Sequence, residues 1–214
     1  MPVIIRSKDC KPNNIFSGCQ VKSLLQPDVI GNDQIFLDHI KVSSGAEYTI
    51  DLDGEMIGWI QVLSGQGSFL GVTNILTPDL ISYLPLGFQG TYVSGEGDSI
   101  LLVARVPNAF RFDPEVRNMA KELRQIDWTR EPILKSEHDA RKRIYMATPT
   151  LAGTKAFKGE MITYPPGAAA PEHHHVGAEH FQYIISGRLI ALLNGDRQEL
   201  EAGDVLYNYE HELH

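Results

Sequence analysis

Apolar and polar positions along this chain form short runs that end at glycine, proline, asparagine or aspartate. The runs with strand character are residues 58–72, 80–87, 99–106, 158–167, 181–200 and 204–208. Turn signals recur about every 8 to 12 residues, which is typical of all-β sandwiches and barrels. Within the longest run, Asn194-Gly195 is a strong signal for a two-residue hairpin turn. The pattern therefore predicts an all-β protein.

One segment, residues 113–128, has the period of a helix instead. Asp113 is a candidate N-cap, and Pro114 stands at the first helical position. The apolar positions that share one helix face are Val116, Met119, Ala120 and Leu123. We expect an amphipathic helix here, followed by a polar linker.

The β-rich segments on the two sides of this helix resemble each other. Residues 59–71 parallel residues 181–195, because each is an apolar strand that ends in Ser-Gly and is followed by a second strand. Residues 78–87 parallel residues 203–211 as the later strand. A tandem duplication of one β-unit explains this likeness. The expected domains are 1–111, a helical linker 112–143, and 144–214.

Composition and charge narrow the classes of partner. Of the 214 residues, 43% are hydrophobic and 21% are charged, and the formal net charge is −8. An acidic chain is poorly suited to nucleic acid, because phosphate contacts need clustered Lys and Arg. The basic run Arg141-Lys142-Arg143 is short and leads into an apolar stretch, so we interpret it as a solvated strand entry. We expect no nucleic-acid partner.

Membrane and disulfide signals are weak. No stretch approaches the ~20 apolar residues needed to cross a bilayer, and the first residues show no signal-peptide pattern. Cys10 and Cys19 are too few for a disulfide framework or a four-ligand zinc site. We therefore expect free thiols in a cytoplasmic protein without a membrane partner.

Four of the eight histidines lie between residues 171 and 180. His173 and His175 are two positions apart, so in an extended strand both rings lie on one side. His174 then points to the other side and is interpreted as a surface or rim residue. One pair of rings can therefore converge on a metal.

The strand that follows offers a choice between His180 and Glu179. Alternation places His180 and Gln182 on one face and Glu179 and Tyr183 on the other. Only one of His180 and Glu179 can be a regular ligand from this strand. If Phe181 packs in the outer layer, His180 and Gln182 face the interior.

These positions resemble the first characteristic motif of the cupin superfamily. The motif is matched by Gly167, five residues, His173-X-His175, four residues to position 180, six residues and Gly187. The slot at position 180 usually holds Glu and here holds His. Glu179 would occupy that slot only if the spacing contracted by one residue, so we prefer His180.

A later stretch resembles the second cupin motif. Gly203-Asp204 open it, and His214 lies eleven positions after Gly203, where cupins place their last ligand histidine. The Pro and Gly usual in this motif are replaced by Tyr209 and His211. This departure leaves the loop conformation open, but not the position of His214.

The resemblance implies a metal site and supporting residues. Its expected ligands are His173, His175, His180 and His214. Imidazole ligands suit Fe(II), Mn, Ni, Cu and Zn, and among these one Fe(II) ion is favoured. Gln182 is a candidate second-sphere hydrogen-bond donor, while Glu179, Tyr183 and His211 are candidate bases.

The same template covers residues 45–65 without its ligands. Asp51 and Asp53 occupy the His-X-His slots, Gly58 occupies the third slot, and Gly90 stands in place of the last histidine. We interpret the two aspartates as part of a solvated turn. The N-terminal barrel is therefore expected to be structural.

The resemblance covers about residues 30–106 and 144–214. It implies an all-β bicupin of two tandem double-stranded β-helix (jelly-roll) barrels joined by a helix and linker. Cupins usually continue past the second-motif histidine, so we expect the second barrel to be incomplete at the C-terminus of a chain fragment. Alternatively, residues 1–7 have strand character and add to the second barrel, in cis or by exchange in a dimer.

Three function classes follow from the resemblance. The first is a metal-dependent dioxygenase acting on a small organic acid or aromatic substrate. The second is an oxygen-independent isomerase, lyase or cyclase, and the third is a non-catalytic small-molecule-binding cupin. In each class the partner is a small molecule, and we expect a homodimer.

Overall fold

A computed structural model describes residues 2–193 and 195–214, and strands dominate it, which confirms the all-β prediction. The strands are β1 (Val3–Ile5), β2 (Asn13–Phe16), β3 (Cys19–Leu25), β4 (Phe36–Val42), β5 (Glu47–Asp51), β6 (Ile57–Ser64), β7 (Gly67–Phe69), β8 (Leu80–Leu84), β9 (Gln89–Ser94), β10 (Ser99–Val106), β11 (Arg124–Asp127), β12 (Leu134–Lys135), β13 (Lys142–Ala147), β14 (Gly159–Thr163), β15 (His180–Tyr183), β16 (Arg188–Leu193), β17 (Asp196–Glu201) and β18 (Val205–Asn208). The short helices are α1 (Pro27–Ile30) and α2 (Pro149–Ala152), with 3-10 turns η1 (Ala109–Arg111), η2 (Pro114–Asn118) and η3 (Trp128–Arg130).

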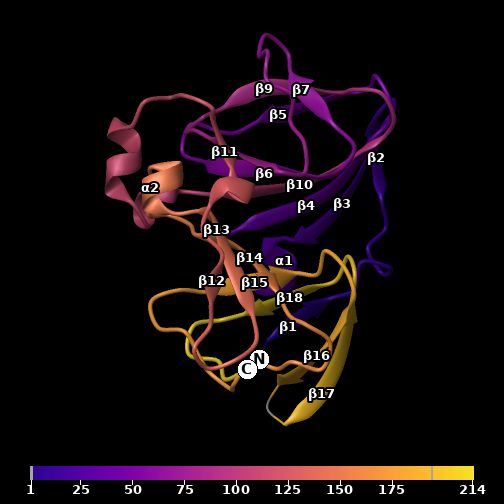
Figure 1. Cartoon of the computed structure of the whole chain (residues 1–214). Coiled ribbons are helices and arrows are strands. Elements are labelled where there is room, and N and C mark those ends of the chain that lie inside the picture. Colours follow the sequence, from indigo (N-terminus) through magenta and orange to yellow (C-terminus); the bar gives the residue numbers. More distant parts are fainter. Residues whose placement is uncertain (1, 194) are drawn as a thin grey trace.

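The first half of the chain forms two facing sheets (Figure 1). A seven-stranded sheet runs in the order β11-β8-β6-β10-β4-β3-β2, and a three-stranded sheet runs β5-β9-β7. Alternate residues of β6 and β10 point between these sheets, among them Ile60, Val62, Leu101 and Val103. This apolar layer is the core of the first half.

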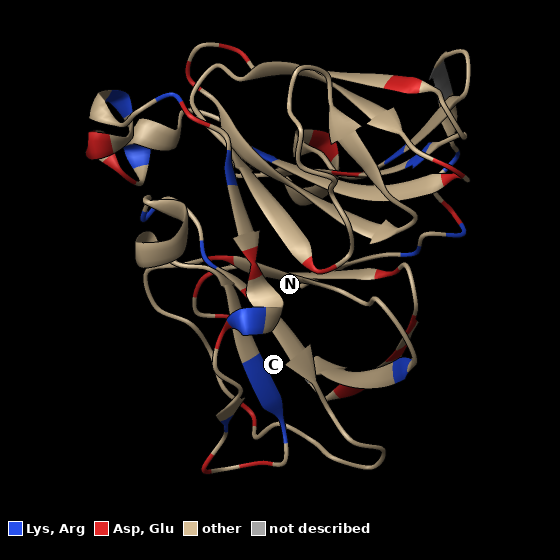
Figure 2. Cartoon of the chain, turned by 45° about the horizontal axis from the view of Figure 1, so that its top comes forward, with Lys and Arg blue, Asp and Glu red and all other residues tan. Residues whose placement is uncertain are grey.

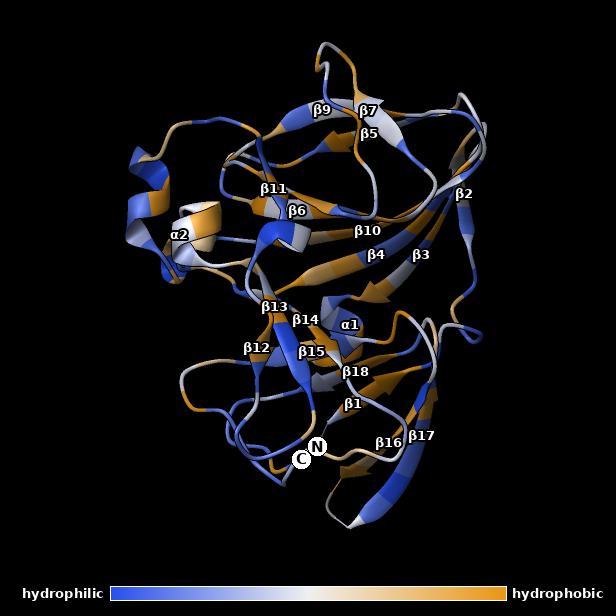
Figure 3. Ribbon diagram, in the orientation of Figure 1, coloured by the Kyte–Doolittle hydropathy of each residue, from blue (hydrophilic) through white to orange (hydrophobic). Residues whose placement is uncertain are grey.

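The second half is built from smaller sheets, β1-β18-β15, β12-β13-β14 and β16-β17. Its interior holds Ile184, Ala191, Leu193, Leu200 and Leu206. Figure 3 shows the β16–β17 hairpin with an apolar strand, β16, beside a polar strand, β17. The second half therefore has a smaller apolar core than the first.

A third apolar layer lies between the halves. Trp59 of β6 stacks on Phe157 with ring centroids 4.6 Å apart, and its centroid is 6.3 Å from that of Phe181 in β15. Tyr83 and Tyr207 are buried in the same layer. Burial of aromatic rings of this size is a large hydrophobic contribution, so the two halves share one core.

The strand predictions are confirmed for each of the six runs. The predicted hairpin within residues 181–200 exists, since β16 pairs with β17 and Leu193 lies opposite Asp196. Asn194, on which that turn prediction partly rests, lies outside the described residues. Gly195 has φ +87°, a backbone conformation that glycine adopts without strain.

The expected helix over residues 113–128 is wrong. Asp113 accepts a hydrogen bond from Glu115 N at 3.3 Å, as an N-cap should, but only the 3-10 turn η2 follows. Met119 turns to an extended backbone, and β11 pairs with β8 at the edge of the seven-stranded sheet. Ile126 is buried there. Strand pairing and burial outweigh a weak helix propensity, so the linker is not helical.

The N-terminal strand lies in the second half of the molecule (Figure 1). β1 pairs antiparallel with β18, with Ile4 opposite Leu206. The carboxylate of Asp204 anchors this strand, because Arg6 Nη1 and Ser7 N each donate to it at 3.0 Å. The alternative in which the N-terminal segment adds to the second barrel in cis is therefore observed for residues 3–5.

Charged residues of both signs are interspersed over both halves (Figure 2). Cys10 and Cys19 are free, as expected. Among the described residues, no helix is long and apolar enough to span a bilayer.

Candidate metal centre

Backbone pairing brings the C-terminal histidine beside the histidine-rich loop. His173 N donates to His214 O at 2.9 Å, and His214 N donates to His173 O at 3.0 Å. His211 N also donates to His175 O at 2.9 Å. The segment 211–214 is thus held against the loop as a short antiparallel pair, which places His214 next to His173.

Four imidazole rings converge at this place. Ligand atoms of His173, His175 and His214 lie within 4.8 Å of one another. The ring centroid of His180 is 4.3 Å from that of His175 and 4.7 Å from that of His214. The structure therefore brings together all four histidines predicted from the motif spacing.

Backbone carbonyls orient two of the rings. His173 Nδ1 is 2.9 Å from Pro171 O, and His214 Nδ1 is 2.9 Å from Glu212 O. A proton on each Nδ1 serves these carbonyls and leaves Nε2 with its lone pair. His214 Nε2 is buried and has no hydrogen-bond partner in the described part of the chain.

His180 is oriented by a side chain instead. Asn208 lies opposite it in the β15–β18 ladder, and Asn208 Nδ2 is 3.1 Å from His180 Nε2. The other ring nitrogen, Nδ1, and Asn208 Oδ1 are buried without partners among the described atoms. When the oxygen and nitrogen of the Asn208 amide are exchanged, Asn208 Oδ1 accepts a hydrogen bond from His180 Nε2–H. His180 Nδ1 is then the ring atom that can bind a metal.

Three of the rings have lowered pKa values, which favours their neutral form. Burial lowers the pKa of His180 to about 3, and the neighbouring histidines add to the shift. Burial is also the largest cause that lowers the pKa of His175 and of His214. Neutral imidazole is the form that binds a metal, so four converging rings, two of them with buried nitrogens that have no partner among the described atoms, suit a divalent transition metal.

Glu179 points away from this cluster. Its carboxylate accepts hydrogen bonds from the Tyr207 hydroxyl and from Asn32 Nδ2, the latter at 3.0 Å. Burial and the nearby Glu179 carboxylate raise the pKa of Tyr207 well above its usual value. Between the two candidates for the third position, the structure places His180 among the rings and Glu179 on the opposite face of β15.

The other two candidate catalytic residues, Gln182 and Tyr183, lie on opposite faces of β15. Gln182 is on the His180 face of β15, opposite Leu206, and no hydrogen bond joins it to the histidines in the described structure. Tyr183 lies on the opposite face, where its ring centroid is 6.4 Å from that of His39. Burial raises the pKa of Tyr183 to about 12. The structure does not bring Tyr183 to the cluster.

His174 and His211 are exposed, as expected for rim residues. Their ring centroids are 6.3 Å apart. His211 has φ +66°, a left-handed backbone that glycine adopts more easily. His211 stands where the second motif usually has glycine, and its backbone keeps the left-handed conformation.

Asn208 was missed by the sequence reasoning. It is 0% exposed, and it ends the buried run of β18. A polar residue at the end of an apolar strand was the available signal, since buried amides need hydrogen-bond partners. That signal does not say which residue lies opposite.

In the described part of the chain, the corresponding place in the first half holds no such cluster. Asp51 accepts from Gln89 Nε2 at 2.9 Å, and Asp53 accepts from Glu55 N at 3.0 Å. Both aspartates are exposed, which agrees with a solvated turn. A Cβ on Gly58 would lie 2.5 Å from Ala104 O, so that slot has no room for a side chain.

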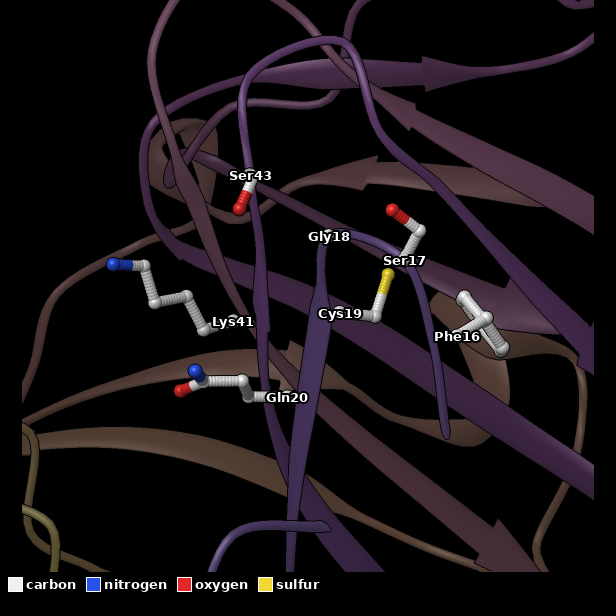
Figure 4. A pocket seen from close by; sticks show the side chains of 7 residues that line it. All are labelled: Phe16, Ser17, Gly18, Cys19, Gln20, Lys41 and Ser43. Carbon is white, nitrogen blue, oxygen red and sulfur yellow. The ribbon is translucent and has the colours of Figure 1, made fainter. Parts of the chain in front are cut away.

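A hollow of about 310 Å³ lies elsewhere, at the β2–β3 turn (Figure 4). It is lined by Phe16, Ser17, Gly18, Cys19, Gln20, Lys41 and Ser43. This lining has no histidine or carboxylate and includes no residue of the histidine cluster. The hollow is therefore separate from the candidate metal centre.

A comparison with known protein families matches the C-terminal part of the chain to one family. Residues 160–214 match the family described as Cupin domain. The tetracenomycin polyketide synthase protein TcmJ of Streptomyces glaucescens is 33% identical over 63 residues, which are 29% of this chain and 42% of that protein. The aligned segment thus spans less than half the length of this curated relative.

Solved structures share the fold over 99% of the chain. Protein Ylba from E. coli has a TM-score of 0.77 at 19% identity, with 84% of its own chain covered. A putative glyoxylate induced protein from Pseudomonas aeruginosa has a TM-score of 0.77 at 13% identity, with 81% covered. An oxalate decarboxylase OxdC mutant from Bacillus subtilis has 0.72 at 14%, with 72% covered. The family match thus concerns residues 160–214, and the likeness to the solved structures shows that the chain shares their fold.

Proposed function

We propose that this chain is a metal-dependent enzyme whose centre is held by His173, His175, His180 and His214. The observation that carries the proposal is the convergence of four imidazole rings, two of which have buried ring nitrogens without partners among the described residues. Four nitrogen donors suit Fe(II), which we favour, and also Mn, Ni, Zn or Cu. The expected stoichiometry is one ion per chain.

The favoured reaction is a dioxygenase reaction on a small organic acid or aromatic substrate. Such a metal supplies Lewis acidity and a template for substrate oxygens. The chain contributes the orientation of the rings, through the Pro171 and Glu212 carbonyls and Asn208. The relative TcmJ is a polyketide synthase protein by name, which supports a small organic substrate.

An oxygen-independent lyase, isomerase or cyclase is the second candidate. The structural neighbour named oxalate decarboxylase removes a carboxyl group from a small acid, which favours a lyase. A non-catalytic small-molecule-binding cupin is the remaining alternative. All three function classes contain the histidine centre, and they differ in whether the bound molecule is converted and in whether oxygen is consumed.

The bicupin organisation belongs to the same proposal and is supported by a repeated strand register. Trp59 lies opposite Tyr83 in the β6–β8 pair, and Phe181 lies opposite Tyr207 in the β15–β18 pair. The two halves thus place equivalent aromatic residues in the layer that they share. A tandem duplication accounts for this equivalence.

The position next to each aromatic pair differs between the halves. Gly58 faces Leu84 in the first half, where His180 faces Asn208 in the second. A first barrel with this glycine and leucine cannot supply the third ring or its support. We therefore assign the first half a structural role, and we also propose that the protein is a homodimer.

Metal content tests the centre directly. The protein is purified from medium supplemented with Fe, Mn, Ni, Zn and Cu, and bound metal is measured by inductively coupled plasma mass spectrometry. We expect about one ion per chain, lost in His180→Ala and retained in Glu179→Ala. His174→Ala is the matched control with an exposed histidine. A protein that stays folded and metal-free under all these conditions would overturn the proposal.

Oxygen uptake separates the reaction classes. The metal-loaded protein is given a panel of small carboxylates and aromatic acids in an oxygen electrode. Substrate-dependent oxygen consumption supports the dioxygenase, and product formation under anaerobic conditions supports the lyase, isomerase or cyclase. Light scattering of the purified protein gives the oligomeric state, for which we expect twice the mass of 23.8 kDa.

A further inference from the structure

The β15–β18 ladder has one face toward the candidate metal centre and the other toward the first half of the chain. His180 and Asn208 lie opposite each other on the face of the centre. Alternation places the next pair along the ladder, Phe181 and Tyr207, on the other face. These two rings pack in the apolar layer between the halves, together with Tyr209. The back of the ladder that carries the centre is therefore in contact with the first half.

One turn of the first half, residues 30–32 at the end of α1, lies against this back face (Figure 1). Ile30 is 1% exposed, and Gly31 has φ +70° and donates its N–H to Pro27 O at 2.8 Å, which ends the helix. Asn32 Oδ1 accepts a hydrogen bond from Gln34 N at 3.1 Å and so stabilises the chain after the helix. The conformation of this 30–32 turn is therefore set by contacts within the first half.

Asn32 holds the residue that precedes the third ring of the centre. Its Nδ2 donates to Glu179 Oε2 at 3.0 Å, and the Tyr207 hydroxyl donates to the same oxygen. Hydrogen bonds to a carboxylate are stronger than those between neutral groups. Glu179 is directly followed by His180, the first residue of β15. Asn32 therefore fixes the chain at the point where the His180 ring enters the centre.

Tyr209 holds the segment that carries the fourth ring. Its hydroxyl donates to Ile30 O at 2.6 Å. This carbonyl is at the C-terminal end of α1, where carbonyl groups lack partners within the helix. Tyr209 O also accepts from Glu212 N at 3.3 Å, in the turn that leads to His214. The Tyr209 hydroxyl thus joins the start of the 209–214 segment to the first half.

We propose that the 30–32 turn of the first half positions the metal centre, through Asn32 for His180 and through Tyr209 for His214. The ring centroids of these two histidines are 4.7 Å apart, so a shift of either segment changes their separation. Metal binding requires ligand distances within a few tenths of an ångström. Asn32 and Tyr209 are positioning residues, since they act from the opposite face of the ladder. This inference rests on the proposed function, because it concerns the same centre.

Co(II) binding tests the inference, because the visible absorption of bound Co(II) depends on the number and geometry of its ligands. We expect Tyr209→Phe and Asn32→Ala each to weaken Co(II) binding by about tenfold, measured by competition with a chromophoric chelator, and to change the absorption spectrum. Both variants keep all four rings, so each should still bind one Co(II) per chain at saturation.

Two matched controls remove similar groups elsewhere. Tyr92→Phe removes a buried hydroxyl that donates to Ser99 Oγ at 2.9 Å within the first half. Asn118→Ala removes an exposed amide in η2. We expect both controls to bind Co(II) with the affinity and the spectrum of the parent protein.

A purely structural role would lower the free energy of unfolding and leave the metal centre unchanged. Parent-like Co(II) affinity and spectrum in both Tyr209→Phe and Asn32→Ala would therefore overturn the inference. Urea unfolding of each metal-free variant verifies that it folds. Tyr209→Phe removes a single oxygen atom, so it decides the question if Asn32→Ala does not fold.

Hydrogen exchange of the metal-free protein separates this inference from the proposed function. His211 N and His214 N donate to the histidine-rich loop, and these amides should exchange faster in Tyr209→Phe, while the amides of β17 keep their parental rates. If the parent binds no Co(II) but these amides respond to Tyr209→Phe, the proposed function is wrong and the anchoring of the segment is supported. If the parent binds Co(II) and neither the amides nor the spectrum responds, the inference is wrong and the proposed centre is supported.

Discussion

Asn208 and His180 lie opposite each other in the β15–β18 ladder, with the Asn208 amide nitrogen 3.1 Å from His180 Nε2. Asn208 is 0% exposed, so water does not compete for this contact. The pair fixes the orientation of a ring whose other nitrogen has no partner among the described atoms. A neutral amide thus supports the histidine that replaces the usual glutamate of the first motif.

Asn208→Leu should weaken metal binding while the strand persists. Leucine fills a similar volume but cannot hydrogen-bond the ring, and loss of such a supporting contact costs about 10- to 100-fold in metal affinity. Competition with a chromophoric chelator measures the affinity. Asn118→Leu, an exposed asparagine in η2, is the control. Equal affinities for Asn208→Leu and the parent would show that the amide does not support the site.

The metal-free protein should lose stability as the pH falls from 6.5 toward 3. Burial lowers the pKa of folded His180 to about 3, whereas the unfolded ring titrates near 6.5. Between these values the unfolded chain binds more protons, so the free energy of unfolding decreases as pH falls, by at most about 1.4 kcal/mol per pH unit from this ring. Urea unfolding in EDTA at pH 7.0, 6.0 and 5.0 measures the slope.

His180→Gln should flatten that slope, because glutamine does not titrate. His174→Gln, at an exposed position, should leave the slope unchanged. The same slope in His180→Gln and the parent protein would mean that other groups, such as His175 and His214, whose pKa values are also lowered, carry the whole effect.

Arg6→Ala should release the N-terminal strand. Burial is the largest influence on the Asp204 pKa and raises it, but hydrogen bonds from Arg6, Glu201 N and Ser7 N together hold it below its usual value. Removing the arginine leaves a carboxylate that is 3% exposed without its cation, which costs about 1–3 kcal/mol. Hydrogen exchange of the β1 amides should then become faster. Lys8→Ala, at an exposed residue, should leave it unchanged.

Asp113→Ala should destabilise the junction between the halves. The carboxylate accepts from Thr154 Oγ1 and Lys155 N, each at 2.8 Å, and Asp113 is 5% exposed. Each buried donor left without an acceptor costs about 1–3 kcal/mol, so we expect a loss of about 2–4 kcal/mol in urea unfolding. Asp127→Ala removes similar bonds at a more exposed site and should cost about 1 kcal/mol or less. Equal losses in the two variants would contradict this role.

Local patterns were sufficient for much of the fold and part of the centre. Alternation and turn residues located the strands, because both signals act over a few neighbouring positions. The capping residue Asp113 was also identified, since an N-cap depends on the next two or three residues. The helix predicted after Asp113 does not form, because residues 124–127 pair as β11 with β8, a strand distant in sequence.

Local patterns and long-range contacts also contribute separately at the histidines. Spacing placed His173 and His175 on one side of the chain, and the resemblance to the second cupin motif named His214. His180 was preferred to Glu179 on motif spacing, but strand alternation alone allowed either. The fold separates them, because Glu179 hydrogen-bonds Tyr207 and Asn32 while His180 faces Asn208. These partners come from segments distant in sequence, and long-range pairing of that kind is decided by packing in three dimensions and not by a local pattern of residues.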